Sequence, residues 1–284
     1  REVTAQFYRM FGTSVSHNTV STLVRTLDSE RKKFQTRRLP DDYEYIVLDG
    51  MYVRCMPAPA PVLAGVQAGT SVRKMVVLLA RGIRADGSRE VIDFRVAAGE
   101  RERAWEDFLR DLFDRGLEGE SVRCFTHDGS EGLEAAIDSV YGAVKTQRCI
   151  HHKLSNVWDA VADKARHESI REDASQVYDA PTAEEARRRL ANFGRAWARR
   201  EPEAVATMCR DFEATLTYYE LPPEHESWVR TSNPMERSIR ELRRCLDTVG
   251  TFQGIASCRL LVYLAIKKIG DERRNAVPYS LWAS

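Results

Sequence analysis

The order of strand and helix patterns between residues 43 and 165 most restricts how this 284-residue chain can fold. From Tyr43 the apolar spacing changes to β-rich runs, and the turn Asp86-Gly87-Ser88 joins two of them, which is typical of an antiparallel meander. Helix and strand patterns then alternate. The runs are YEYIVLDGMYVRCM, KMVVLLARGI and REVIDFRVA as strands, RERAWEDFLRDLFDRG as a helix, SVRCFTHDG as a strand, SEGLEAAIDSVYG as a helix, VKTQRCI as a strand and HHKLSNVWDAVADKA as a helix.

This β-β-β-α-β-α-β-α order is that of the ribonuclease H fold, in which helices flank a mixed five-stranded sheet. We therefore predict an α/β protein with a ribonuclease H-like core at residues 40–165, completed by C-terminal helices at residues 229–284. Residues 166–228 show only helical spacing, punctuated by prolines, and predict an all-α insertion before the last helix of the site. Residues 1–39 have the pattern of a partial helix-turn-helix-like DNA-binding segment, which a plain helical hairpin would also explain.

Three acidic residues occupy positions that this fold would bring together. Asp49 follows the apolar run IVL and precedes a Gly, and Asp128 has the same setting in CFTHDG. The first and fourth strands are neighbours in the predicted fold, and Glu236 opens the helix that follows the insertion. An Asp at the end of one strand is usually a turn former. Carboxylates from two neighbouring strands and a helix, however, suit two divalent ions about 3.5–4 Å apart that cleave a phosphodiester.

Glu236 also has a purely structural explanation. In TSNPMERSIREL, Asn233 suits the N-cap, Pro234 the first helical position and Glu236 the third, which makes a capping box. In that role Glu236 would add about 1 kcal/mol of stability. Because Asp49 and Asp128 leave a metal site that needs one more carboxylate, we predict that Glu236 points into the cleft instead.

Four segments resemble, in order and spacing, the bacterial insertion-sequence transposases of the Mutator type, a DDE class built on the ribonuclease H fold. They are YEYIVLDGMYV, FTHDGSEGLEAAI, QRCIHHKLSN and WVRTSNPMERSIRELRR, within a similarity that runs from about Phe7 to about Ile269. The resemblance implies that Asp49, Asp128 and Glu236, separated by 79 and 108 residues, form the catalytic and metal-binding triad.

The same resemblance implies the reaction and its participants. We expect Mg²⁺-dependent hydrolysis at the ends of a mobile element, followed by attack of the freed 3′-hydroxyl on target DNA. Two Mg²⁺ ions are expected, with Mn²⁺ able to substitute. The expected partners are double-stranded DNA, as the terminal inverted repeats and the target, and further copies of the chain in a dimer or larger assembly. The expected location is the bacterial cytoplasm, in association with the nucleoid.

Two stretches depart from the family pattern. Family members usually carry more DNA-binding helices at the N-terminus, whereas this chain opens in mid-pattern at Arg1, so we expect a fragment or a truncated copy. The stretch MPAPAPVLAGVQAG after the first strand is unusually rich in Ala and Pro. Neither difference affects the three carboxylates, but both bear on whether this chain alone transposes an element.

Cys149 and His152 match the C-x-x-H signature of the family in QRCIHH. A C-x-x-H pair also resembles half of a zinc site, but no second pair at zinc spacing is evident. We therefore favour a pair beside the catalytic pocket that shapes the site or touches DNA. A half-buried Cys with a His at a helix cap remains the plainest alternative.

Positive charge is concentrated at the two ends of the chain. Residues 1–39 carry a net charge of +5, residues 229–284 also carry +5, and the 189 residues between them carry −9. Such a distribution suits a polyanion, although two solvated basic helices would give the same numbers. The candidate DNA contacts are Arg237, Arg240, Arg243 and Arg244 on the helix of Glu236, and Ser16, His17 and Asn18 in the helix-turn-helix-like segment.

Composition excludes several other classes of protein. With 43% hydrophobic and 30% charged residues the chain is globular, and no apolar run reaches the ~18–20 residues of a membrane span. The six cysteines are scattered through apolar stretches, which favours reduced thiols over a disulfide framework. Two other functions stay open: a ribonuclease H-like nuclease using the same carboxylates, and a degenerate or co-opted transposase-derived protein that binds DNA without cutting it.

Overall fold

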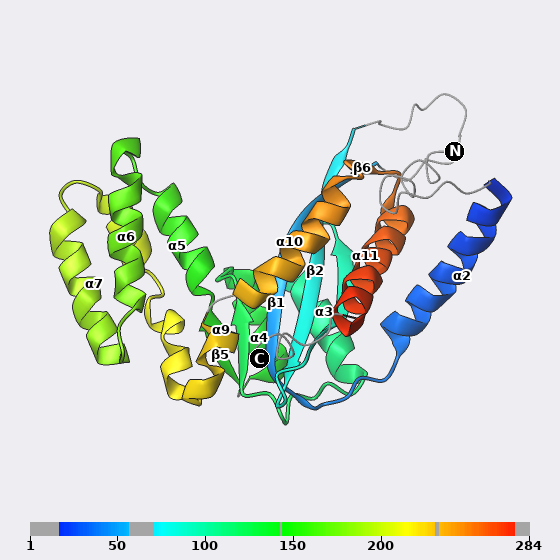
Figure 1. Ribbon diagram of the computed structural model, residues 1–284, viewed down its shortest axis with the longest axis horizontal. Coiled ribbons are helices and arrows are strands. Elements are labelled where there is room, and N and C mark those ends of the chain that lie inside the picture. The colour runs from blue at the N-terminus through cyan, green and yellow to red at the C-terminus, as the bar shows by residue number, and fades with distance from the viewer. Residues whose placement is uncertain (1–16, 57–70, 143, 231–232, 276–284) are drawn as a thin grey trace, which may run out of the picture.

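One mixed sheet flanked by helices forms the centre of the molecule, with a group of further helices at one side (Figure 1). The computed structural model describes residues 17–56, 71–142, 144–230 and 233–275, and within them all side chains except those of residues 17–21, 233–239 and 271–275. The strands are β1 (Tyr43–Cys55), β2 (Arg73–Arg84), β3 (Arg89–Ala97), β4 (Cys124–His127), β5 (Lys145–Arg148) and β6 (Thr251–Phe252). The helices are α2 (His17–Thr36), α3 (Glu102–Asp114), α4 (Glu131–Tyr141), α5 (Ile150–Asp159), α6 (His167–Tyr178), α7 (Ala183–Trp197), α8 (Pro202–Cys209), α9 (Glu226–Val229), α10 (Asn233–Asp247) and α11 (Ile255–Asn275).

The sheet order is β3-β2-β1-β4-β5, with β6 paired to β1 as well. The β1–β2 and β2–β3 pairs are antiparallel, whereas β1–β4, β4–β5 and β1–β6 are parallel. The predicted mixed α/β architecture is therefore confirmed.

The prediction of five strands was wrong, because β6 adds a sixth. Its two residues pair with Arg54 and Cys55 near the end of β1, whereas the last β1–β4 pair joins Val47 to Thr126. The 13-residue β1 runs on beyond β4, so its edge is open there to a second partner. Two residues are too few to produce a period-2 pattern, which explains why the sequence does not reveal this strand.

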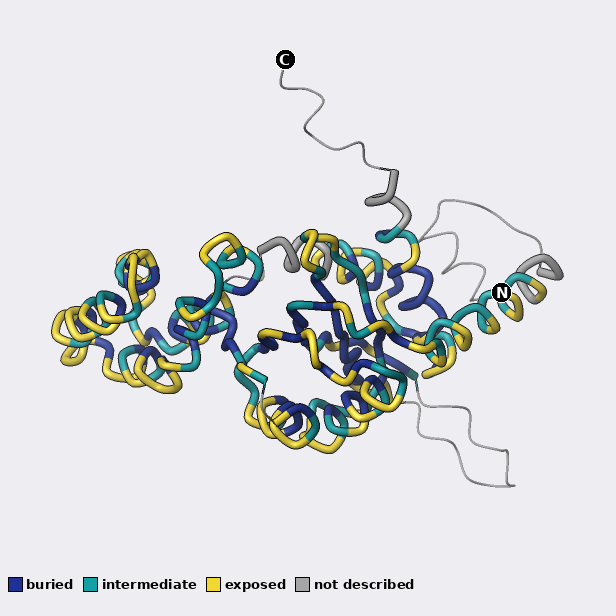
Figure 2. The backbone as a smooth tube through the Cα atoms, turned by 90° about the horizontal axis from the view of Figure 1, so that it is seen from below, coloured by how far each residue is buried: buried dark blue, intermediate teal, exposed yellow. Residues whose placement is uncertain are grey.

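The central strand β1 is covered on both faces, because successive side chains of a strand point to opposite sides. Val47, Met51 and Val53 are buried in a cluster with α10 and α11. Ile46 and Leu48 are buried in a second cluster with α3 and α4. Figure 2 shows the buried strands in dark blue between the two helical layers. Asp49 has the parity of Val47 and Met51, and therefore lies on the α10 side of a rigid strand.

Residues 166–228 are helical where they have regular structure, and contain α6, α7 and α8 with the start of α9. With α5 they form a third apolar cluster, which also includes Tyr45, Ile83 and Cys124 of the sheet. This cluster lies beside the β4–β5 end of the sheet, away from β6 (Figure 1). None of the described helices is long and apolar enough to cross a membrane.

Helix α2 packs on the core. The rings of Phe34 and Tyr263 lie 5.6 Å apart between centroids, and the Gln35 amide donates to the Phe94 carbonyl at 2.7 Å. The C-terminal half of the segment predicted as DNA-binding is thus joined to α11 and β3. The first helix of that pattern and Ser16 lie outside the described residues, and His17 and Asn18 open α2 without described side chains.

Candidate active site

Asp49 and Asp128 follow the paired residues of two neighbouring parallel strands. The β1–β4 register pairs Tyr45 with Cys124, Ile46 with Phe125 and Val47 with Thr126, always 79 residues apart. Asp49 and Asp128 have the same separation, two positions beyond the last of these pairs. β4 ends at His127, so Asp128 is the first residue after the strand and Asp49 lies where β1 loses its β4 neighbour. The fold therefore brings together the two aspartates that the sequence singled out.

Asp49 is a buried carboxylate, with 8% of its surface exposed. Burial raises its pKa, and the negative charge of Asp128 raises it further. The positive charges of His152 and Arg243 act in the opposite direction and lower the pKa. A buried carboxylate is costly unless cations or hydrogen bonds compensate it, and His152 and Arg243 supply positive charge near Asp49.

Asp128 is also a turn former, as the local pattern alone would indicate. Its Oδ1 accepts a hydrogen bond from the Ser130 amide at 2.9 Å, which uses one of its two oxygens. Gly129 follows with φ of +92°, in the left-handed region that favours glycine. A Cβ at this position would also lie 2.2 Å from Nε of Arg148. The turn thus holds the Asp128 carboxylate at a defined place at the end of β4.

Cys149 and His152 lie beside the two aspartates. Cys149 is buried just after β5, and His152 lies in the first turn of α5. A hydrogen bond to Cys149 raises the pKa of His152 to about 9, helped by the negative charges of Asp49 and Asp128 and opposed by burial. Among the described side chains, no group of three or more His, Cys, Asp or Glu residues could hold a metal ion.

Helix α10 brings a third element to the site. Arg243 is exposed, yet it is near enough to lower the pKa of Asp49. Glu236 lies in the first turn of α10, seven residues earlier, and seven residues are about two turns at 3.6 residues per turn. The backbone of α10 therefore places Glu236 on the same face as Arg243, although its side chain lies outside the described residues.

The predicted DNA-contacting arginines are only partly described. Arg240, Arg243 and Arg244 are exposed on α10, whereas the side chain of Arg237 lies outside the described residues. Basic side chains thus line the helix that passes beside Asp49.

Glu100 is a carboxylate at this site that the sequence patterns did not single out. It lies between β3 and α3, and its Oε2 accepts a hydrogen bond from the Tyr52 hydroxyl at 3.2 Å. Burial raises the pKa of Glu100, and the negative charges of Asp128 and Asp49 add to that effect. A Cβ at Gly50 would lie 2.0 Å from its Oε1, so the glycine after Asp49 makes room for it. That glycine was the only signal in the sequence.

The chain as a whole is similar to proteins of one known family. Residues 1–276 match the family model described as "Transposase, Mutator family". The transposase for insertion sequence element ISRM5 of Rhizobium meliloti (strain 1021) is 32% identical over 268 residues, which are 94% of this chain and 64% of that protein. The transposase for IS6120 of Mycolicibacterium smegmatis is 29% identical over 233 residues, 82% of this chain and 67% of that protein. This chain therefore spans roughly two thirds of the length of these relatives.

Among solved structures, the Drosophila P element transposase strand transfer complex matches with a TM-score of 0.34 and 8% identity, over 92% of this chain and 74% of that one. So distant a likeness carries no argument about individual residues. The family match covers nearly the whole chain and includes every segment on which the resemblance was based. The chain belongs to the Mutator family of transposases.

Proposed function

We propose that this chain is the catalytic core of an insertion-sequence transposase, with a ribonuclease H-like fold and a triad of Asp49, Asp128 and Glu236. The observation that carries the proposal is the β1–β4 register, which Asp49 and Asp128 both follow by two positions while α10 passes beside them. Three antiparallel strands followed by two parallel ones, in the order β3-β2-β1-β4-β5, support the ribonuclease H-like assignment.

The residues present fit divalent metal ions. Asp49 is buried beside a second carboxylate, and hard oxygen ligands of this type are the ones that Mg²⁺ and Mn²⁺ take in phosphate chemistry. Asp49, Asp128 and Glu236 would hold two such ions. When bound, the ions supply activation of the attacking hydroxyl and stabilisation of the leaving oxygen.

Cationic side chains near the carboxylates have a separate part in the reaction. Arg243, Arg240 and Arg244 would contact phosphates on either side of the scissile bond and position the strand. His152 would orient the wall of the pocket through its hydrogen bond to Cys149 and offset the charge of Asp49. The expected substrate is double-stranded DNA at the element ends and at the target, bound by a homodimer or a larger assembly.

The test is a cleavage and strand-transfer assay with DNA made from the sequences that flank the coding region. With Mg²⁺ or Mn²⁺ present we expect nicking at the element end and covalent joining of its 3′ end to a target plasmid. Nicking without joining would instead support the ribonuclease H-like nuclease. Salt-dependent DNA binding without any product that depends on a divalent ion would support the co-opted DNA-binding protein.

Replacing Glu100 by Gln is expected to raise the Mg²⁺ concentration for half-maximal cleavage about tenfold, as loss of groups around metal ligands commonly does. The amide keeps the size of the side chain and an acceptor for Tyr52, but removes a negative charge near Asp49 and Asp128. The melting temperature without metal should stay equal or rise, because like-charge repulsion is relieved. Glu102→Gln, at an exposed position two residues away, is the control. Equal Mg²⁺ dependence in the two variants would exclude a role for Glu100.

A further inference from the structure

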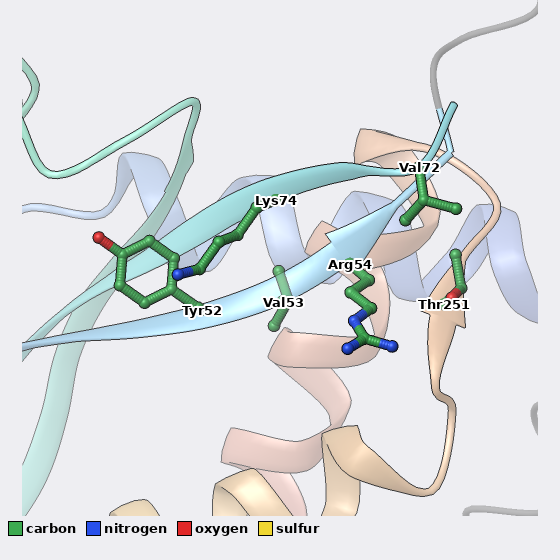
Figure 3. Close-up of a pocket in the computed structure, with 6 residues that line it drawn as sticks. All are labelled: Tyr52, Val53, Arg54, Val72, Lys74 and Thr251. Carbon is green, nitrogen blue, oxygen red and sulfur yellow. The ribbon is translucent and has the colours of Figure 1, made fainter. Parts of the chain in front are cut away.

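An open groove with basic and aromatic walls lies at the end of the sheet next to the aspartates. We call it the strand groove; it has a volume of about 610 Å³ and is lined by Tyr52, Val53, Arg54, Val72, Lys74 and Thr251 of β1, the start of β2 and β6 (Figure 3). None of these described lining residues is acidic. Arg73, next to Lys74, is exposed as well. The groove therefore has the charge that suits an anionic ligand.

Two cations come from paired strand positions in this groove, with the Lys74 ammonium lying over the Tyr52 ring and the Arg54 guanidinium pointing away from it (Figure 3). Arg54 pairs with Lys74 in the antiparallel β1–β2 register and with Thr251 in the parallel β1–β6 register. Like charges opposite each other destabilise a pair of strands. The arrangement becomes favourable when an anion lies between or over the two side chains, as a phosphate would. Glu100, beside Tyr52, offsets part of the Lys74 charge, and a bound phosphate would supply the remaining counter-charge.

The groove also exposes apolar surface that a folded core would normally cover. Tyr52 is 49% exposed and Val72 is 48% exposed, and they are two of the four large hydrophobic residues described as exposed. The Lys74 ammonium lies 3.8 Å from the centroid of the Tyr52 ring. Aromatic rings beside basic groups are the combination with which proteins bind unpaired nucleotides, because bases stack on the ring while cations meet the backbone.

The strand groove leads to the candidate active site. Tyr52 is three residues beyond Asp49 on β1, and its hydroxyl donates to Glu100, whose pKa is raised partly by Asp128 and Asp49. Arg54 is five residues beyond Asp49, about 17 Å at 3.3 Å per residue of strand. That length matches about five stacked nucleotides at 3.4 Å each. Because side chains alternate along β1, Tyr52 and Arg54 lie on the face opposite Asp49, and a strand with its scissile phosphate at the aspartates would reach them past Glu100, at the open edge of β1.

We propose that the strand groove binds a short unpaired stretch of the DNA strand that adjoins the scissile phosphate, with a base on Tyr52 and phosphates at Arg54 and Lys74. The proposal rests on the proposed function and adds to it a substrate feature. Duplex DNA alone would not use the exposed ring, because paired bases present only their edges.

The experiment measures binding of two DNA probes by fluorescence anisotropy in the presence of EDTA. One probe is a 20-bp duplex with a five-nucleotide single-stranded tail, and the other is the same duplex with blunt ends. Tyr52→Ala should weaken binding of the tailed probe about tenfold and leave the blunt probe unchanged, whereas Tyr52→Phe should bind as the unaltered chain does. The pair Arg54→Ala/Lys74→Ala should lower the salt slope for the tailed probe by about 1.4, at 0.7 for each phosphate contact.

Lys164→Ala/Arg199→Ala is the matched control, since it removes two exposed cations, one just before the helical insertion and one within it. Circular dichroism melts check the fold, and Tyr52→Leu replaces Tyr52→Ala if the latter melts early. Equal tailed-probe binding by the groove variants and the control would overturn the proposal, and so would an equal loss for both probes. Because EDTA prevents metal-dependent cleavage, a tail-specific loss upholds the strand groove even if the cleavage assay fails. If the chain cleaves DNA but the groove variants show no loss specific to the tailed probe, only the proposal for the strand groove is refuted.

Discussion

Replacing Asp128 by Asn is expected to lower Mg²⁺-dependent strand cleavage about 1,000-fold or more without unfolding the chain. Charge stabilisation by a metal ion contributes several kcal/mol to such a reaction, and a loss of about 4 kcal/mol is a factor of about 10³. An Asn carbonyl oxygen can still accept the hydrogen bond from the Ser130 amide, so the turn after β4 is retained. Asp49→Asn and Glu236→Gln should have losses of similar size.

The measurement is the initial rate of nicking on element-end DNA at saturating Mg²⁺, with circular dichroism to compare the folded state. Asp107→Asn, at an exposed position on α3, is the control and should cleave as the unaltered chain does. If any one of the three carboxylate variants kept more than about a tenth of the rate, that residue would have no place in the triad.

Replacing Gly82 by Ala is expected to be the most damaging small substitution for stability. A Cβ at Gly82 of β2 would lie 2.1 Å from a ring carbon of Tyr43, and that ring is fully buried. The Tyr43 hydroxyl also donates to Glu90, which fixes the ring further. Overpacking of this kind costs about 3 kcal/mol, which corresponds to a fall of about 6–12 °C in melting temperature.

Gly99→Ala serves as the matched control for Gly82→Ala. No heavy atom lies within 4 Å of a Cβ built at Gly99, so the melting temperature should change by less than about 2 °C. Differential scanning calorimetry measures both variants. Similar melting temperatures for the two would show that the Tyr43 ring is not held over Gly82 as described.

The site illustrates how far local patterns carry a prediction. The proximity of Asp49 and Asp128 could be predicted from sequence, because each follows a recognisable strand pattern. The two strands are neighbours in the predicted fold and pair in parallel in the structure. Glu100 could not, since it belongs to no periodic segment and reaches the site only through the path of the chain from β3 to α3. The approach of Arg243 to Asp49 depends in the same way on how α10 packs, which helical periodicity does not specify.

The fold, like the site, was only partly predictable from local sequence patterns. β-rich segments alternating with helical patterns were sufficient to find β1 to β5, whereas β6 depends on an open edge of β1 that only the assembled sheet reveals. The helical pattern of α2 was evident from the sequence. Its packing on α11 through Phe34 and Tyr263 was not, because an amphipathic pattern shows that a helix face is buried but not which element covers it.

The site combines features that oppose stability. Asp49 is buried near Asp128, and both aspartates raise the pKa of Glu100. Without a metal ion these carboxylates repel one another, and the positive charges of His152 and Arg243 offset that repulsion in part. Binding of a divalent ion to the folded chain should therefore stabilise it by mass action, because the ion relieves the repulsion among Asp49, Asp128 and Glu100.

The most direct test of the triad is an anomalous difference map from crystals of this chain grown with DNA and Mn²⁺. We expect anomalous peaks held by the carboxylates of Asp49, Asp128 and Glu236, with the Glu236 side chain turned into the cleft. Mn²⁺ peaks located elsewhere, or a Glu236 carboxylate bonded back to the Asn233 amide while the aspartates bind the ions alone, would contradict it.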